Sequence, residues 1–153
     1  MVSLERLTRD NWRQVITLDI ADDQRRFVTT PSVLYGVAEV QFHPTYTAYA
    51  IYDGETVVGF ATYGHAPDDP TKWWVPLILI DRHHQGKGYG RAAMQEIIRR
   101  IQGKAPDCRE IALNYEPSNT VAERLYLSLG FEKSTETDDH GYVIARLHLK
   151  QAV

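Results

Sequence analysis

The sequence predicts a mixed α/β (α+β) fold, and three observations support it. Two runs of strand-forming residues, 48–52 and 56–63, flank Asp53-Gly54-Glu55, which is a strong hairpin signal. An apolar run over 77–80 leads through a glycine-rich turn into a segment, 89–101, whose apolar residues recur at helical spacing. The 153 residues, 43% of them hydrophobic, suffice for one core, and no repeat, linker or low-complexity segment divides them. We therefore expect a single domain over residues 1–153.

The first part of the chain is expected to form a strand and two helices. A strand is expected over 2–7, after which Thr8 or Asp10 can cap a helix. The apolar face of this helix would hold Trp12, Val15, Ile16 and Ile20. A second helix is expected beyond Pro31, although Gly36 weakens it because glycine is a poor helix former.

Four further strands are expected after the first hairpin. The segment 67–70 should be a polar loop that precedes a strand over 73–80. Pro76 is unusual in that strand because proline lacks the N–H that a central strand needs, so we expect a local distortion there. The last strands are expected over 109–115 and in a closing hairpin of 131–137 with 142–149.

The glycine-rich turn is the most informative feature for function. It comprises seven residues: Gln85, Gly86, Lys87, Gly88, Tyr89, Gly90 and Arg91. Glycines let backbone N–H groups approach a ligand, and the first turn of a helix offers unpaired donors and a positive dipole end. The turn therefore suits a phosphate or pyrophosphate, although a turn of this kind can also simply reverse the chain. Its spelling matches neither a dinucleotide fingerprint nor the Gly-Lys-Ser/Thr of a nucleoside-triphosphate loop.

The spelling instead resembles the Gln/Arg-x-x-Gly-x-Gly/Ala signature of the GNAT superfamily of N-acetyltransferases, carried here by Gln85, Gly88 and Gly90. A second set of residues independently resembles the other signature of this superfamily: Asn119, Ala122, Leu125, Tyr126, Gly130 and Phe131. The resemblance covers nearly the whole chain. It implies an acetyl-CoA-dependent enzyme with a mixed, mostly antiparallel seven-stranded sheet, splayed fourth and fifth strands, and about four flanking helices. It also places a bulge of the fourth strand near Leu79, and family analogy makes a homodimer plausible.

Composition excludes several other classes of protein. Cys108 is the single cysteine, so no intramolecular disulfide and no thiolate metal cluster can form, and we expect no metal. The net charge of −3 and the absence of a long basic run argue against a nucleic-acid partner. No apolar run approaches the ~20 residues that span a bilayer, and the N-terminus lacks the layout of a signal peptide. We expect a cytoplasmic protein with no membrane partner.

The resemblance implies roles for the cofactor-binding residues. Backbone amides at Leu79 and Ile80 would lie beside the acetyl and pantetheine groups, and those of Gln85 to Arg91 would hold the pyrophosphate. Lys87 or Arg91 can add positive charge near the phosphate oxygens, or can be solvated surface residues. Asn119 would contact the pantetheine or cap a helix, and Arg124 would reach the ribose phosphate.

The resemblance also names a candidate general acid. Tyr126 matches the tyrosine that the family uses to protonate the departing sulfur, and a phenol with a pKa near ~10 stays protonated at neutral pH. Packing on an amphipathic helix is the alternative for this tyrosine. Glu116 is the better candidate for the general base, although the base can also be an ordered water. His83 and His84 are expected to be polar loop residues.

The substrate implied is a primary amine, and most specifically a polyamine. The segment from Gln24 to Leu34, the first hairpin and the run 80–88 resemble the bacterial diamine and spermine/spermidine acetyltransferase branch. Polyamines need separated carboxylates with apolar or aromatic walls between them. The candidates are Asp22, Asp23, Phe27, Glu39, Glu116, Asp138 and Asp139. Two alternatives stay open: another amine, for which Phe27, Trp73 and Trp74 would suit a bulkier substrate, or a non-catalytic acyl-CoA-binding module.

Overall fold

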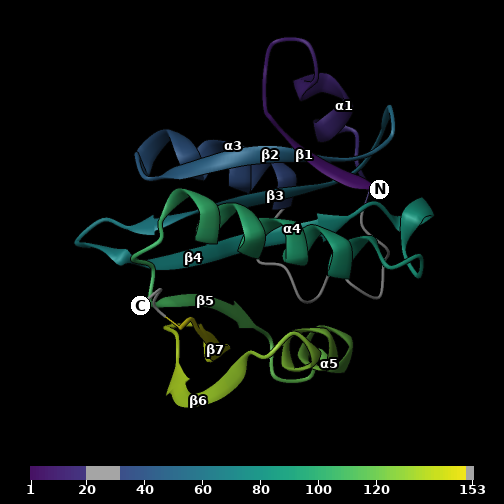
Figure 1. Cartoon of the computed structure of the whole chain (residues 1–153). Helices are drawn as coiled ribbons and strands as arrows, with labels where there is room; N and C mark the ends of the chain where they lie inside the picture. Colours follow the sequence, from purple (N-terminus) through teal and green to yellow (C-terminus); the bar gives the residue numbers. More distant parts are fainter. Residues whose placement is uncertain (20–31, 151–153) are drawn as a thin grey trace.

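A seven-stranded mixed sheet organises the protein, seen in a computed structural model that describes residues 1–19 and 32–150 (Figure 1). The strand order is β1-β2-β3-β4-β5-β7-β6, and every adjacent pair is antiparallel except β4 and β5. The strands are β1 (Val2–Arg6), β2 (Tyr46–Asp53), β3 (Thr56–Ala66), β4 (Asp69–Ile80), β5 (Glu110–Tyr115), β6 (Glu132–Thr137) and β7 (Val143–His148). The predicted fold class is confirmed.

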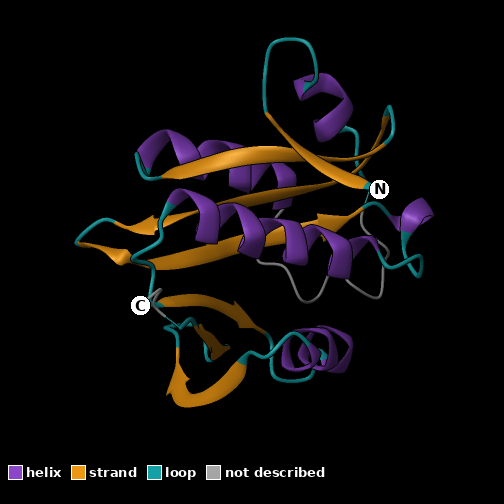
Figure 2. Cartoon of the chain, viewed as in Figure 1, coloured by secondary structure: helices purple, strands orange, loops and turns teal. Residues whose placement is uncertain are grey.

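Helices cover both faces of the sheet (Figure 2). They are α1 (Trp12–Ile16), α3 (Ser32–Phe42), α4 (Tyr89–Lys104) and α5 (Thr120–Ser128), with a short 3-10 turn η1 at Arg82–His84. One buried cluster lies under α4 and α5 and includes Met94 and Ile97, while a second cluster on the opposite face includes Val15, Val33 and Phe60. None of the helices in the described part of the chain is long and apolar enough to cross a membrane.

Gly36 has a packing role within α3. A Cβ atom at this position would lie 2.7 Å from Phe60 Cε1 and 2.8 Å from Leu77 Cδ2, which is closer than packed atoms tolerate. The glycine therefore lets α3 lie directly on the sheet, and this close packing offsets its low helix propensity.

The first helix differs from its prediction. The observed N-cap is Asn11, not Thr8 or Asp10, because the Asn11 side chain holds the preceding turn: its Oδ1 accepts from the Thr8 N–H at 2.8 Å and its Nδ2 donates to the Arg6 carbonyl at 3.1 Å. The helix ends at Ile16. Within the expected apolar face, Val15 is buried but Trp12 and Ile16 are exposed, and Ile20 lies outside the described residues.

The polar loop expected over 67–70 is also shorter than predicted. Only Pro67 and Asp68 form the turn, and Asp69 already begins β4. The Asp69 carboxylate accepts hydrogen bonds from the Thr71 N–H at 2.9 Å and the Thr71 hydroxyl at 2.6 Å. These bonds form an Asx turn beside the register shift between His65 and Ala66, so an irregular part of β4 replaces the expected loop.

The splay of β4 from β5 is confirmed, and it begins in the middle of β4. The parallel pairing covers Lys72–Trp74 against Glu110–Ala112 and stops there. On the other side of β4, the register with β3 shifts between the Thr62–Leu77 and Gly64–Trp74 pairs, so Val75 and Pro76 together oppose one residue. The irregularity therefore lies at Pro76, and the expectation of a bulge near Leu79 is wrong, since Leu79 pairs regularly with Phe60.

Candidate active site

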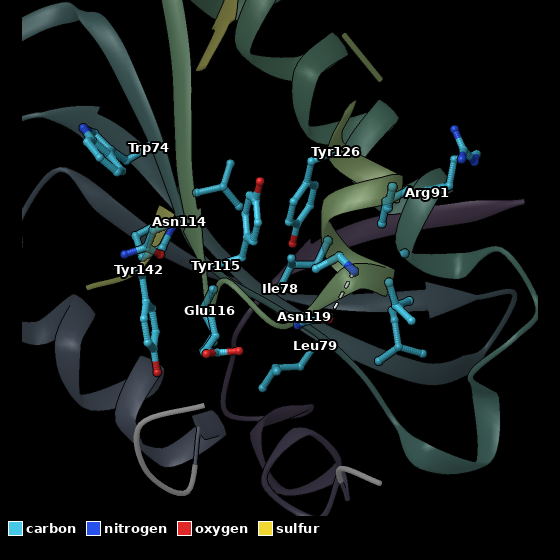
Figure 3. A pocket seen from close by; sticks show the side chains of 18 of the residues that line it. Trp74, Ile78, Leu79, Arg91, Asn114, Tyr115, Glu116, Asn119, Tyr126 and Tyr142 are labelled. Atoms are coloured by element: carbon cyan, nitrogen blue, oxygen red, sulfur yellow. Dashed lines mark hydrogen bonds between the residues drawn. The ribbon is translucent and has the colours of Figure 1, made fainter. Parts of the chain in front are cut away.

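A cavity of about 820 Å³ opens where β4 and β5 separate. Leu77 and Leu79 of β4 pack on the α3 side of the sheet, whereas Ile78 and Ile80 pack on the α4 side, and all four line the cavity. The cavity therefore reaches both faces of the sheet. Figure 3 shows Tyr126 and Tyr142 on opposite sides of this space, with Glu116 between them.

The glycine-rich turn borders one end of the cavity. Gly86 and Gly88 have φ angles of +77° and +82°, in the left-handed region that favours glycine. Gly88 is the N-cap of α4 and supplies no side-chain cap, so the first-turn N–H groups remain available to an anion. The arrangement fits an elongated ligand that carries a pyrophosphate at one end.

Two side chains hold this turn in place. The Gln85 amide donates to the Ile80 carbonyl at 3.1 Å and ties the turn to the end of β4. The Tyr89 hydroxyl donates to the Asp53 carboxylate at 2.5 Å, which connects α4 to the first hairpin. This hydrogen bond lowers the pKa of Asp53 and raises the pKa of Tyr89. Gln85 and the Tyr89 hydroxyl thus position the backbone of the turn.

Most of the predicted cofactor-binding residues line the cavity. These are Leu79, Ile80, Gln85, Gly86, Gly88, Tyr89, Gly90, Arg91 and Asn119. Lys87 and Arg124 are not among its lining residues. Asn119 is the N-cap of α5, where its Oδ1 accepts from the Ala122 N–H at 3.2 Å, so the capping alternative is realised.

Tyr126 is buried in the wall of the cavity, with 8% of its surface exposed. Its ring packs between Tyr115, at a centroid distance of 5.9 Å, and Phe131, at 6.0 Å. Figure 3 shows its hydroxyl pointing toward the part of β4 that carries Ile78 and Leu79. Burial raises the pKa of Tyr126 to about 12, so the phenol is protonated and can donate a proton at neutral pH.

Two predicted carboxylates that line the cavity are already hydrogen-bonded. Glu116 accepts from the Ser118 N–H at 2.8 Å and from the Ser118 hydroxyl. Asp138 accepts from Asn114 Nδ2 at 2.6 Å and from the N–H groups of His140 and Tyr142 at 2.8 and 2.9 Å. Asp138 therefore organises the β6–β7 turn, while its neighbour Asp139 is exposed and does not line the cavity.

The end of the cavity nearest α3 is rich in aromatic residues. Three of its residues, Glu39, Trp74 and Asp138, were expected from the sequence, whereas six were not: Tyr35, His43, Tyr46, Asn114, His140 and Tyr142. The sequence carried a usable signal, because residues 35 and 39 are four positions apart and share one face of α3, and His43 follows at the same spacing just beyond the helix end. Trp73 does not face this space: it is buried under α4 and donates its indole N–H to the Pro70 carbonyl at 3.1 Å. The expectation that it walls the substrate site is wrong, since adjacent strand residues point to opposite faces.

Several other predicted residues either lie outside the described part of the chain or differ in whether they line the cavity. Asp22, Asp23 and Phe27, together with Gln24, lie outside the described residues. His84 lines the cavity, whereas His83 does not. Within 1–19 and 32–150, no group of three histidine, cysteine or acidic residues could hold a metal ion.

Comparisons with known proteins agree with this geometry. The model of the acetyltransferase (GNAT) family matches residues 6–131. A probable spermine N(1)-acetyltransferase from Bacillus subtilis subsp. natto is 30% identical over 92% of this chain and 93% of its own. The spermine/spermidine N(1)-acetyltransferase of Bacillus subtilis strain 168 is 29% identical with the same coverage. Among solved structures, an aminoglycoside acetyltransferase in complex with coenzyme A superposes with a TM-score of 0.77, at 19% identity over 97% of this chain and 95% of that one.

The family match spans most of the chain and includes both the glycine-rich turn and Tyr126. The protein belongs to the acetyltransferase (GNAT) family, and acetyl-CoA is its acetyl donor.

Proposed function

We propose that this enzyme transfers an acetyl group from acetyl-CoA to a primary amine of a polyamine. The observation that carries the proposal is the cavity itself, in which the Tyr126 hydroxyl faces the unpaired part of β4 beside an uncapped helix N-terminus. The two Bacillus relatives, named for spermine and spermidine, support a polyamine as the acceptor.

The glycine-rich turn would hold the phosphate groups of the cofactor. The N–H groups of Gly88, Tyr89, Gly90 and Arg91 lie in the first turn of α4 or at its cap, where the helix dipole favours negative charge. Gly86 and Gly88 allow this approach because they carry no side chain that would cover the donors. Lys87 and Arg124 would add only long-range attraction, since neither lines the cavity.

The open part of β4 would hold the pantetheine arm and the acetyl group. Because pairing with β5 ends at Trp74, the edge of β4 from Val75 to Ile80 faces the cavity instead of a strand. The backbone N–H of Ile80 would then stabilise the negative charge that develops on the carbonyl oxygen, and one such donor can contribute ~3 kcal/mol. Leu79 pairs with Phe60 of β3 and would contribute its side chain to the wall. Asn119 would border the arm from the start of α5.

The acyl transfer requires a new N–C bond, cleavage of the C–S bond and two proton movements. Acetyl-CoA supplies the thioester whose thiolate departs. Tyr126 would donate its phenolic proton to that sulfur, and its raised pKa keeps the proton available at neutral pH. Glu116 would accept the proton lost by the attacking amine, directly or through water, because its carboxylate lies between the two ends of the cavity (Figure 3).

A second acceptor class is favoured by one specific comparison. The solved structure that superposes at a TM-score of 0.77 is an aminoglycoside acetyltransferase. The aromatic walls formed by Trp74 and Tyr142 would also accommodate a bulkier amine. We rank this class below polyamines because that structure is 19% identical to this chain, whereas a relative named for spermine is 30% identical.

Release of CoA thiol from acetyl-CoA, measured with spermidine, spermine and kanamycin as separate acceptors, tests the proposal. We expect saturable release with the polyamines and a product heavier by one acetyl group. Turnover of kanamycin alone would favour the second class. Binding of acetyl-CoA without turnover of either class would leave the family assignment in place and reject the polyamine.

A further inference from the structure

We infer that Glu39 binds the second, non-reacting ammonium group of a diamine or polyamine acceptor, with Tyr35 and Tyr46 as the walls of that subsite. This inference rests on the proposed function and extends it by naming the group that recognises the distant amine.

Among the described residues, three carboxylates line the cavity: Glu39, Glu116 and Asp138. Asp138 accepts three hydrogen bonds that shape the β6–β7 turn, and Glu116 accepts two from Ser118. These hydrogen bonds hold both carboxylates in the local structure of their own turns. Glu39 also has no lysine or arginine within ion-pair distance in the described part of the chain, and its hydrogen-bond donor is the Tyr35 hydroxyl, so its carboxylate holds no turn and can meet a ligand on the α3 side.

The surroundings of Glu39 suit a cation. Burial raises the pKa of Glu39, and the effects of His43 and of a hydrogen bond from Tyr35 do not outweigh it. A half-buried carboxylate without a lysine or arginine partner gains stability when an ammonium group binds beside it. Tyr46 lies close enough for the charge of Glu39 to raise its pKa, and its ring stacks on His43 at a centroid distance of 5.2 Å. Aromatic faces beside a carboxylate attract an alkylammonium group and its methylene stem.

The position of Glu39 explains why the second amine, not the first, would bind there. Glu39 and Tyr35 lie on α3, which packs on the face of the sheet opposite α4, and His43 directly follows the helix. Tyr126 belongs to the cluster on the α4 side. An acceptor whose amine reacts near Tyr126 would therefore extend through the opening toward α3, and a second charge along its chain would reach Glu39.

The test compares two acceptors of equal length, 1,4-diaminobutane and n-pentylamine, which differ by one amine in place of a methyl group. Wild-type enzyme should prefer the diamine, and Glu39→Gln should lower kcat/KM for diaminobutane and spermidine roughly tenfold to a hundredfold, mainly through KM. The same substitution should change kcat/KM for n-pentylamine less than about twofold, because that acceptor has no second ammonium group to lose. Glu39→Asp, which keeps the charge, should recover part of the preference.

Glu55→Gln is the matched control, because Glu55 is an exposed carboxylate in the first hairpin turn and does not line the cavity. Thermal melting and acetyl-CoA binding should be unchanged in the Glu39 variants, and calorimetry should show weaker spermidine binding by Glu39→Gln in the presence of CoA. Equal losses with both acceptors, or no loss with either, would overturn the inference while leaving polyamine acetylation intact. Failure of the wild-type enzyme to acetylate any polyamine would reject the proposed function and this inference together.

Discussion

Asn114, at the end of β5, donates a hydrogen bond of 2.6 Å to Asp138, in the turn between β6 and β7. The same carboxylate accepts the N–H groups of His140 and Tyr142, both of which line the cavity. Asp138 thus connects β5, at the edge where β4 and β5 separate, to the β6–β7 turn that borders the cavity. A carboxylate that sequence alone offered as a ligand for the substrate has a supporting role in the structure.

Asp138→Ala should therefore impair acceptor binding indirectly. Loss of three hydrogen bonds should lower the free energy of unfolding by about 1–3 kcal/mol, and the loosened turn should raise KM for the amine. The KM for acetyl-CoA should change little, because the glycine-rich turn lies elsewhere. Urea unfolding and steady-state kinetics measure both effects. Asp139→Ala is the control, and equal effects at the two positions would contradict the role assigned to Asp138.

Tyr126→Phe should reduce kcat by ~10²-fold or more while leaving acetyl-CoA affinity intact, because the ring still packs between Tyr115 and Phe131 but no proton can be donated. Tyr115→Phe is the control, because it removes the same hydroxyl group from a neighbouring tyrosine. The Tyr115 hydroxyl donates to Glu123 at 3.1 Å, so its loss should lower stability by about 1 kcal/mol without reducing kcat. Similar kcat values for both variants would remove Tyr126 from the role of general acid.

Gly88→Val should weaken acetyl-CoA binding through the backbone. A Cβ atom at Gly88 meets nothing within 4 Å, so packing is not the obstacle; the obstacle is the φ of +82°, which costs a residue with a side chain roughly 1–2 kcal/mol. The turn should relax and its N–H groups should no longer converge on the phosphates. Calorimetric titration with acetyl-CoA would detect the loss.

The control for that substitution is Gly103→Ala, near the end of the same helix. Gly103 has no positive φ and open space around its Cβ direction, so alanine should stabilise α4 by roughly 0.5–1 kcal/mol without changing affinity. Normal acetyl-CoA affinity of Gly88→Val would contradict the assignment of the turn.

Glu96 should make stability depend on acidic pH. Hydrogen bonds from Arg99, with others from Arg100, lower the pKa of Glu96 to about 2, and Arg100 also donates to the Leu4 carbonyl at 2.7 Å. A lowered carboxyl pKa in the folded state stabilises the protein above the unfolded pKa of 4.5, and this stabilisation is lost as pH falls toward 2. The Glu96 side chain is 20% exposed, so we expect roughly 1–2 kcal/mol.

Urea unfolding of wild type and Glu96→Gln at several pH values measures this contribution. The difference between the two proteins should be full at pH 7 and should shrink progressively below pH 4.5. Glu132→Gln, at an exposed carboxylate of β6, should show no such pH-dependent difference. A difference that stayed constant from neutral to acidic pH would show that the Glu96 charge is not responsible.

The sequence by itself determined most of the elements and the position of the glycine-rich turn, because these depend on neighbouring residues. Alternating and helical periodicities predicted the two hairpins and α4, and the glycines at 86 and 88 permit the left-handed backbone that the structure shows there. The two signatures that include Gly88 and Tyr126 were likewise sufficient for the family, which the match over residues 6–131 confirms.

Only the tertiary structure decided which side chains share the cavity. The direction of Trp73 into the core and of Trp74 into the cavity depends on which face of β4 each occupies. The role of Asp138 depends on a partner distant in sequence, since Asn114 lies 24 residues away. The surroundings of Glu39 combine its helix neighbours Tyr35 and His43 with Tyr46 of β2. Contacts between residues distant in sequence produce no periodic pattern in the chain. The residues that line the α3 end of the cavity could therefore be identified only from the folded protein.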